Sequence, residues 1–343
     1  LREVYDMGQK IGKQTIKFTN QVRIKSYYSS VGKKEGEGPL GNYFDVVYND
    51  EYINSKSWEE AENRIIKHTV NGALTEASLT CNDVDYVFSG DLLNQCTASS
   101  FGLKDMGIPY FGLYGACSTM AESMSLASVM VDAGYGKNIL AATSSHFCSS
   151  EKQYRFPLEY GGVRTPTSQW TVTGSGAVIL SDTGTPIRIN SITTGKMVDL
   201  GISDVNNMGA AMAPAAADCI YTHLNDLGIK PDHYDCIVTG DLGDVGSQLL
   251  VELLRKQDVD ISKVHRDCGS MIFDNEVQNT NAGGSGCGCS ASVFCGYFCD
   301  EIIRGQIKNM LLVCTGALMS PTTAQLGENV VGIAHAVGIS SVQ

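Results

Sequence analysis

The sequence predicts an α/β protein made of two matching β-α-β-α-β halves, with two central helices between two mixed, mostly parallel sheets. Strand and helix patterns alternate along the 343 residues, as in sheets covered by helices. The strand pattern DYVFSGD at residues 85–91 returns as DCIVTGD at residues 235–241. Each half also contains one helix pattern rich in Ala, Ser and Gly. These three observations point to a duplicated fold.

In the first half, residues 14–185, the strand at 85–91 is followed by a helix pattern around 97–105. A second strand is expected at 108–114, and a small-residue helix begins at Ser118. A closing strand starts with KNIL, which follows that helix. The order of these patterns gives the β-α-β-α-β unit.

The second half, residues 186–343, repeats this order. A helix is expected at 247–255, a second strand at 267–273 and a small-residue helix after Gly288. The closing strand starts with KNML, matching KNIL of the first half. Because small side chains let other elements approach a helix from several sides, we expect both small-residue helices to be central.

Four segments lie outside the repeat. Residues 58–77 have the period of an amphipathic helix, and residues 171–180 form a strand pattern rich in glycine. Residues 29–41 read as a loop rich in Gly and Lys. Residues 151–169 show no clear period and predict a long loop, which in a compact domain is often functional.

The composition excludes several classes of function. The net charge of −12 disfavours binding to nucleic acid or directly to anionic lipid. No apolar run approaches the roughly 20 residues of a membrane span. The first 17 residues have no apolar core of the kind found in signal peptides. We therefore expect any association with a membrane to depend on a partner.

Twelve cysteines are present, and many of them fall inside apolar strand or helix patterns. A chain of this length can bury a core without disulfides, so a reducing compartment is the simpler interpretation. A cluster of four cysteines could suggest a metal site, but it runs through an expected buried helix and lacks the paired spacing of zinc knuckles. We expect no metal from this cluster: Cys287, Cys289, Cys295 and Cys299.

Cys117 lies in GACST, where the strand at 108–114 meets the first small-residue helix. A side chain at such a junction points into the crevice beyond the carboxyl end of a strand, where open α/β sheets bind ligands. The N-terminus of a helix also favours negative charge. The sequence therefore predicts that Cys117 lines a pocket and that its thiol has partial thiolate character.

Seven motifs occur in a fixed order. They are GPLGNYFD (38–45), GDLLNQ (90–95), GACST (115–119), AATSSH (141–146), VTGSGAV (172–178), AMAPAAAD (211–218) and AGGSGCGCS (282–290). As a set they resemble the stage V sporulation protein AD family of spore-forming bacteria, a branch of the thiolase-fold superfamily. The resemblance runs from about Gln14 to Val337.

The resemblance implies a function. Members of that family are expected to bind dipicolinic acid, a pyridine dicarboxylate, and to act in its uptake into spores and its release on germination. The expected partners are other membrane proteins of the same sporulation operon. The expected location is the periphery of the spore inner membrane, after synthesis in the cytoplasm. No cofactor is expected, although calcium could arrive with the ligand, and the oligomeric state is left open.

The resemblance also implies that the chain is not an enzyme. Condensing enzymes of this fold use a Cys, a His and an Asn. The His position is occupied here by Asp241 and the Asn position by Ser285. Degradative thiolases use a second Cys, which aligns with Cys314, but no His accompanies it, so we interpret Cys314 as a strand residue of the core. Two alternatives stay open: an acyltransferase that uses Cys117 alone, and an interaction protein with a degenerate pocket.

Local groups must then supply the affinity for a dicarboxylate. We expect backbone N–H groups at the two central helix N-termini, glycines that let the ligand approach the backbone, hydroxyls and a cation to contribute. Asp241 and its repeat mate Asp91 could bind calcium, or each could cap the helix after it; for Asp91 we favour the cap. The expected ligand-binding residues are Cys117, Ser118, His146, Arg155, Asp241, Gly284 and Ser285.

Overall fold

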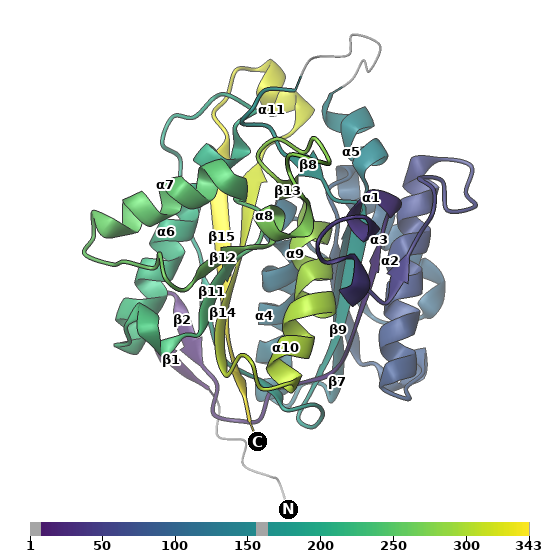
Figure 1. Cartoon of the computed structure of the whole chain (residues 1–343). Helices are drawn as coiled ribbons and strands as arrows, with labels where there is room; N and C mark the ends of the chain where they lie inside the picture. Colours follow the sequence, from purple (N-terminus) through teal and green to yellow (C-terminus); the bar gives the residue numbers. More distant parts are fainter. Residues whose placement is uncertain (1–7, 156–163, 343) are drawn as a thin grey trace, which may run out of the picture.

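The computed structural model describes residues 8–155 and 164–342 and confirms the duplicated α/β fold (Figure 1). The sheet of the first half has the strand order β3 (Arg23–Val31), β9 (Gly174–Ser181), β7 (Asn138–Ser145), β5 (Tyr86–Gly90), β6 (Tyr110–Gly112). The strands β7, β5 and β6 are parallel, whereas β9 is antiparallel to both β3 and β7.

The second half repeats this arrangement strand for strand. Its order is β10 (Ile187–Thr194), β15 (Val331–Ser341), β14 (Asn309–Leu318), β11 (Cys236–Thr239), β12 (His265–Asp267). Here β14, β11 and β12 are parallel, and β15 is antiparallel to β10 and β14. The expected boundary after residue 185 falls between β9 and β10.

The two expected sheets are joined at one edge. A single pairing, Arg188 with Arg23, connects β10 to β3, so the strands of both halves form one continuous path. The path folds back on itself, and the central helices fill the space between its two arms (Figure 1).

The central layer contains both small-residue helices, α4 (Thr119–Asp132) and α9 (Cys287–Val293). After α9 the chain continues through a π-helical turn into α10 (Cys299–Ile303). Close approach explains the small residues: a Cβ added to Gly176 on β9 would lie 2.3 Å from the carbonyl oxygen of Ala291 on α9. No side chain larger than hydrogen fits there.

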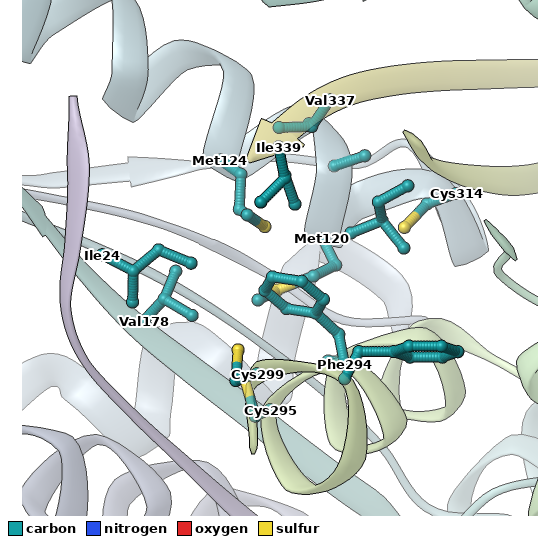
Figure 2. Packing of buried hydrophobic residues seen from close by; sticks show 14 of the residues in the cluster. Ile24, Met120, Met124, Val178, Phe294, Cys295, Cys299, Cys314, Val337 and Ile339 are labelled. Atoms are coloured by element: carbon teal, nitrogen blue, oxygen red, sulfur yellow. The ribbon is translucent and has the colours of Figure 1, made fainter. Parts of the chain in front are cut away.

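The main core lies where this layer meets the strands. Figure 2 shows Met120 and Met124 of α4 beside Phe294 and Cys295, with Ile339 of β15 close to them. All twelve cysteines lie among the described residues and are free thiols. Those of the second central helix are fully buried among apolar side chains, where cysteine acts as a small hydrophobe.

Outer helices cover the sheets. The expected amphipathic helix is α2 (Trp58–Glu76), which packs on β3 and β9 with α3 (Thr97–Leu103) beside it. In the second half, α6 (Met208–Leu227) packs on β14 and β15, and α7 (Gly243–Arg255) packs on α6. None of the helices within the described ranges has the length and apolar character required to cross a bilayer.

Some expected boundaries were wrong. The strand expected at 267–273 ends at Asp267, because the Asp267 side chain accepts a hydrogen bond from Ser270 N (3.0 Å) and caps helix α8 (Cys268–Ile272). The loop expected at 29–41 contains the end of β3 and the short helix α1 (Lys33–Gly36). The loop expected at 151–169 begins inside helix α5 (Phe147–Tyr154), and its residues 156–163 lie outside the described part.

The remaining elements are short. Residue pairing joins β13 to β8 in a separate parallel ribbon, which lies beside the first turn of α9. The bounds of these elements are β1 (Gln9–Ile11), β2 (Thr15–Lys17), β4 (Val46–Val47), β8 (Trp170–Thr171), β13 (Gly284–Ser285) and α11 (Pro321–Gln325).

Candidate functional site

The turn from β6 into α4 holds Cys117 in a strained conformation. Ala116 has φ of 50°, in the left-handed region that residues with a Cβ rarely adopt. Thr119 stabilises the turn, because its hydroxyl donates to Ala116 O (2.6 Å) and accepts from Gly115 N (3.1 Å). Cys117 is 5% exposed. A bent backbone thus presents this thiol at the end of the strand, as the sequence predicted.

A pocket of about 790 Å³, open mouth included, lies in front of this turn. Three of the expected ligand-binding residues line it: Cys117, Arg155 and Ser285. The other lining residues are Leu92, Ala116, Ser150, Glu151, Tyr154, Arg164, Ser168, Gln169, Thr171, Val205, Asn206, Met208, Ala317 and Met319.

Asp241 lies directly behind Cys117 and is fully buried. Its carboxylate accepts hydrogen bonds from Thr315 Oγ1 (2.8 Å) and Gly286 N (2.9 Å). Burial raises the pKa of Asp241 to about 6, while hydrogen bonds from Cys117, Gly286, Thr315 and Ser285 oppose the rise. The carboxylate is therefore largely ionised at neutral pH. It is outside the lining of the pocket, so the expected direct contact of Asp241 with a ligand is not supported.

The Cys117 thiol is protonated. Burial raises its pKa well above the usual value, and the charge of Asp241 raises it further. The expectation of partial thiolate character was therefore wrong. The sequence analysis weighed the favourable helix N-terminus but could not see that burial and a neighbouring anion outweigh it.

The glycine-rich segment before α9 contributes Ser285 to the pocket. Gln169 Nε2 donates to Asp241 O (2.7 Å) and to Gly284 O (2.8 Å), which fastens β13 to the strand end at β11. Ser285 faces the pocket, whereas Gly284 lies behind it. Among the described residues, Gln169 Oε1 is buried without a hydrogen-bond partner. A buried amide oxygen is normally hydrogen-bonded, so this oxygen could accept from a donor on a ligand.

Two arginines share one carboxylate at the wall of the pocket. Glu151 accepts from Arg164 Nη2 (2.6 Å) and lies 3.2 Å from Arg155 Nε. Arg164 also donates to Gln169 O (3.0 Å) and lies 4.8 Å from the centre of the Trp170 ring. The wall thus presents guanidinium groups, which bind carboxylates through charge-assisted hydrogen bonds.

Sequence reasoning selected Arg155 and missed Arg164. The available signal was the long segment at 151–169, in which Arg164 is the second arginine. Lys152, on the same helix α5, does not line this pocket. Its ammonium pairs with Glu59 at 2.6 Å and lines a separate groove.

His146 and Ser118 do not face the pocket. The His146 ring is fully buried, with Nε2 2.9 Å from Glu51 O and Nδ1 accepting from Cys148 N at 3.2 Å. The Ser118 hydroxyl donates to Gly115 O (2.7 Å), and its backbone N–H donates to the same oxygen. Because neither residue lines the pocket, their expected contacts with a ligand there are not supported.

Two structural interpretations from the sequence are confirmed. Asp91 accepts from Ser99 N (2.7 Å) in the first turn of α3 and so caps that helix. Cys314 is a fully buried residue of β14. The repeat mates Asp91 and Asp241 thus differ. Asp91 caps the helix that follows it, whereas Asp241 accepts hydrogen bonds from residues of other elements.

A family model for Stage V sporulation protein AD matches residues 12–340 of this chain. The chain is 44% identical, over 326 residues, to Stage V sporulation protein AD of Bacillus subtilis (strain 168); the alignment covers 95% of this chain and 96% of that protein.

Among solved structures, the chain resembles 3-oxoacyl-[acyl-carrier-protein] synthase III from Aquifex aeolicus VF5, with a TM-score of 0.55 and 15% identity, covering 93% of this chain and 99% of that one. It also resembles cerulenin-bound OleA of Xanthomonas campestris, with a TM-score of 0.56 and 12% identity. This match covers 97% of the present chain and 98% of the OleA chain. At these identities the similarity shows the shared fold.

Proposed function

The chain belongs to the stage V sporulation protein AD family, and we propose that it is a non-catalytic binding protein for dipicolinic acid, or for its calcium chelate, in spores. The ligand would enter the pocket lined by Cys117, Arg155, Arg164 and Ser285. The observation that carries the proposal is the pairing of the Cys117 thiol with the Asp241 carboxylate, which leaves a pocket without an activated nucleophile.

The chemistry of the wall supports an anionic aromatic ligand. Dipicolinate has two carboxylates, one on each side of its ring nitrogen. A carboxylate that approaches Arg164 can replace Glu151 as the partner of its guanidinium and gain charge-assisted hydrogen bonds. Apolar side chains such as Leu92 and Met319 line other parts of the pocket and offer contact to a ring.

The same geometry argues against acyl transfer. A nucleophilic cysteine has to lose its proton, and Asp241 opposes that loss by its charge. An enolate that formed next to Cys117 would face the same carboxylate. That negative charge opposes the charge that develops on the substrate in a condensing reaction.

Calorimetric titration with dipicolinate tests this proposal. The wild type should bind one ligand per chain, and Arg164→Gln should weaken binding by about tenfold to a hundredfold, the usual cost of losing a charge-assisted pair. Lys152→Gln is the matched control, because it removes a cation from the next groove, and its affinity should equal that of the wild type. Equal losses in the two variants would mean that long-range charge, not this pocket, governs binding.

A second candidate is an acyltransferase that uses Cys117 alone. The strained turn at Ala116 and the similarity of the fold to condensing enzymes favour it. Intact-mass spectrometry after incubation with acyl-CoA separates the two functions. An acyl adduct that disappears in Cys117→Ala supports the transferase. If neither dipicolinate nor an acyl group binds, the third interpretation, an interaction protein with a degenerate pocket, gains support.

We further propose that the chain acts at the surface of the spore inner membrane through other membrane proteins of its operon. The net charge of −12 disfavours direct binding to anionic lipid and so supports a role for partners. Salt extraction of spore membranes with and without those partners tests this: without them, the chain should appear in the soluble fraction.

A further inference from the structure

A second group of polar side chains lies outside the pocket. Glu51, His146 and Cys148 each place one donor atom within 4.8 Å of the other two. His146 caps α5 and Cys148 belongs to its first turn, while Glu51 follows strand β4. None of the three lines the pocket of Cys117. A nitrogen, a sulfur and a carboxylate oxygen thus meet at one point, from two separate segments.

The histidine is already arranged as a ligand. Its Nδ1 accepts from Cys148 N and so carries the lone pair of the ring, while Nε2 lies 2.9 Å from Glu51 O. A metal ion at Nδ1 would replace the contact with Cys148 N and leave Nε2–H donating to the Glu51 carbonyl, which is the usual support of a metal-bound histidine.

Two carboxylate oxygens beside this cluster have no partner among the described residues. Glu51 Oε2 is inaccessible to solvent and lies 3.7 Å from His146 Nε2. Glu35 of α1 is fully buried; its Oε1 accepts from Thr173 N (3.0 Å), and its Oε2 has no partner. Thr173 Oγ1 accepts from Phe147 N, between His146 and Cys148. The Glu35 carboxylate therefore lies against the same turn of chain.

A nearby cation, Lys34, has other partners. Its ammonium donates to Gln278 O (2.6 Å) and lies over the Trp170 ring at 4.0 Å. Burying a carboxylate costs free energy unless a cation or hydrogen bonds offset it. A bound metal ion would supply that positive charge.

We propose that Glu51, His146 and Cys148 bind a divalent transition-metal ion of the zinc type, with Glu35 near enough to stabilise the bound charge. Imidazole and thiolate ligands favour Zn²⁺, whereas Ca²⁺ and Mg²⁺ take oxygen ligands. On binding, the Cys148 S–H bond breaks, a sulfur–metal bond forms, and the proton passes to the solvent. The site is separate from the proposed dipicolinate site.

Its role would be to fix one wall of the pocket. Helix α5 starts at the cluster and ends at Tyr154, and Glu151 and Tyr154 on it line the pocket. In Figure 1, α5 lies above α1, the helix that contains Glu35. A metal ion would tie the start of α5 to the segment after β4.

Cobalt titration of the full chain tests the proposal. After treatment with EDTA and in the absence of dipicolinate, Co²⁺ alone should bind once per chain and give the ultraviolet charge-transfer band of a thiolate ligand. Zn²⁺ should remove the band and Ca²⁺ should leave it unchanged. Cys148→Ser should abolish the band, whereas Cys81→Ser, which alters the other half-buried cysteine, should keep it.

A second variant keeps the proposal testable if Cys148→Ser fails to fold. Glu51 is 41% exposed, so Glu51→Gln is expected to fold, and it should weaken cobalt binding at least tenfold. The proposal is overturned if cobalt gives no thiolate band, or if the band persists in folded Cys148→Ser. It is also overturned if Glu51→Gln binds cobalt as tightly as the wild type. Because dipicolinate takes no part, these outcomes are independent of the proposed function.

Discussion

Replacing Asp241 by Asn tests whether its carboxylate keeps the Cys117 thiol protonated. The side chains have nearly the same shape, and the amide can still accept from Thr315 or Gly286, which bond to the carboxylate in the wild type. The substitution removes the negative charge behind the sulfur. Since that charge raises the pKa of Cys117, the pKa should fall in Asp241→Asn.

The size of the effect follows from the geometry of a close charge pair. Two unit charges about 4 Å apart interact by about 4 kcal/mol at an effective dielectric constant of about 20. Removing that interaction should raise the thiolate population at a fixed pH by about a thousandfold. A thiolate of lower pKa is also a weaker nucleophile, with a Brønsted coefficient of about 0.5. On a logarithmic scale about half of the gain in thiolate is therefore lost, and the net rate should rise by on the order of 30-fold.

The assay is alkylation by iodoacetamide at about pH 8, followed by peptide mass spectrometry of Cys117. Thr315→Val is the matched control, because it removes a hydrogen bond to Asp241 but keeps the carboxylate, so the rate should stay slow. The reasoning is refuted if Asp241→Asn reacts no faster than the wild type. It is equally refuted if the wild-type thiol is already alkylated as fast as a free cysteine.

Three further predictions concern stability. In metal-free protein, the free energy of unfolding of Glu35→Gln should increase relative to that of the wild type as pH rises from about 4.5 to about 8. The reason is that burial raises the pKa of Glu35, so ionisation in this range favours the unfolded wild-type chain. If the difference in free energy of unfolding, measured by urea melts, does not change with pH across this range, the prediction is wrong. Phe294→Ala should cost about 3–5 kcal/mol in the same melts, while exposed Leu326→Ala should be near neutral; similar costs would show that Phe294 is not central to the core. Gly176→Ala should lower stability by about 1–3 kcal/mol because its Cβ would clash with Ala291 O; an unchanged melting temperature would refute that contact.

Much of the fold could be predicted because the same order of strands and helices occurs twice in the sequence. The matching strands at 85–91 and 235–241 mark equivalent places in the two halves, and helix patterns rich in small residues mark the central layer. Errors arose where one side chain decides a local structure. Asp267 ends its strand by capping α8, and no periodicity in the sequence signals that choice.

The site was predicted less completely, for a physical reason. The position of Cys117 follows from the order of strand and helix, and Ser285 follows from the glycine-rich motif. Which of several nearby polar groups faces the pocket depends on hydrogen bonds between distant segments. His146 is held by Glu51 and Arg164 by Glu151, and neither pairing has a spacing that sequence reasoning can recognise.

A crystal structure of the chain grown with dipicolinate tests the central claim most directly. We predict one ligand in the pocket, with a carboxylate on Arg164, its ring beside Cys117, and an unmodified sulfur. A ligand bound elsewhere, an empty pocket at saturating dipicolinate, or an acyl group attached to Cys117 would contradict a non-catalytic binding role for this pocket.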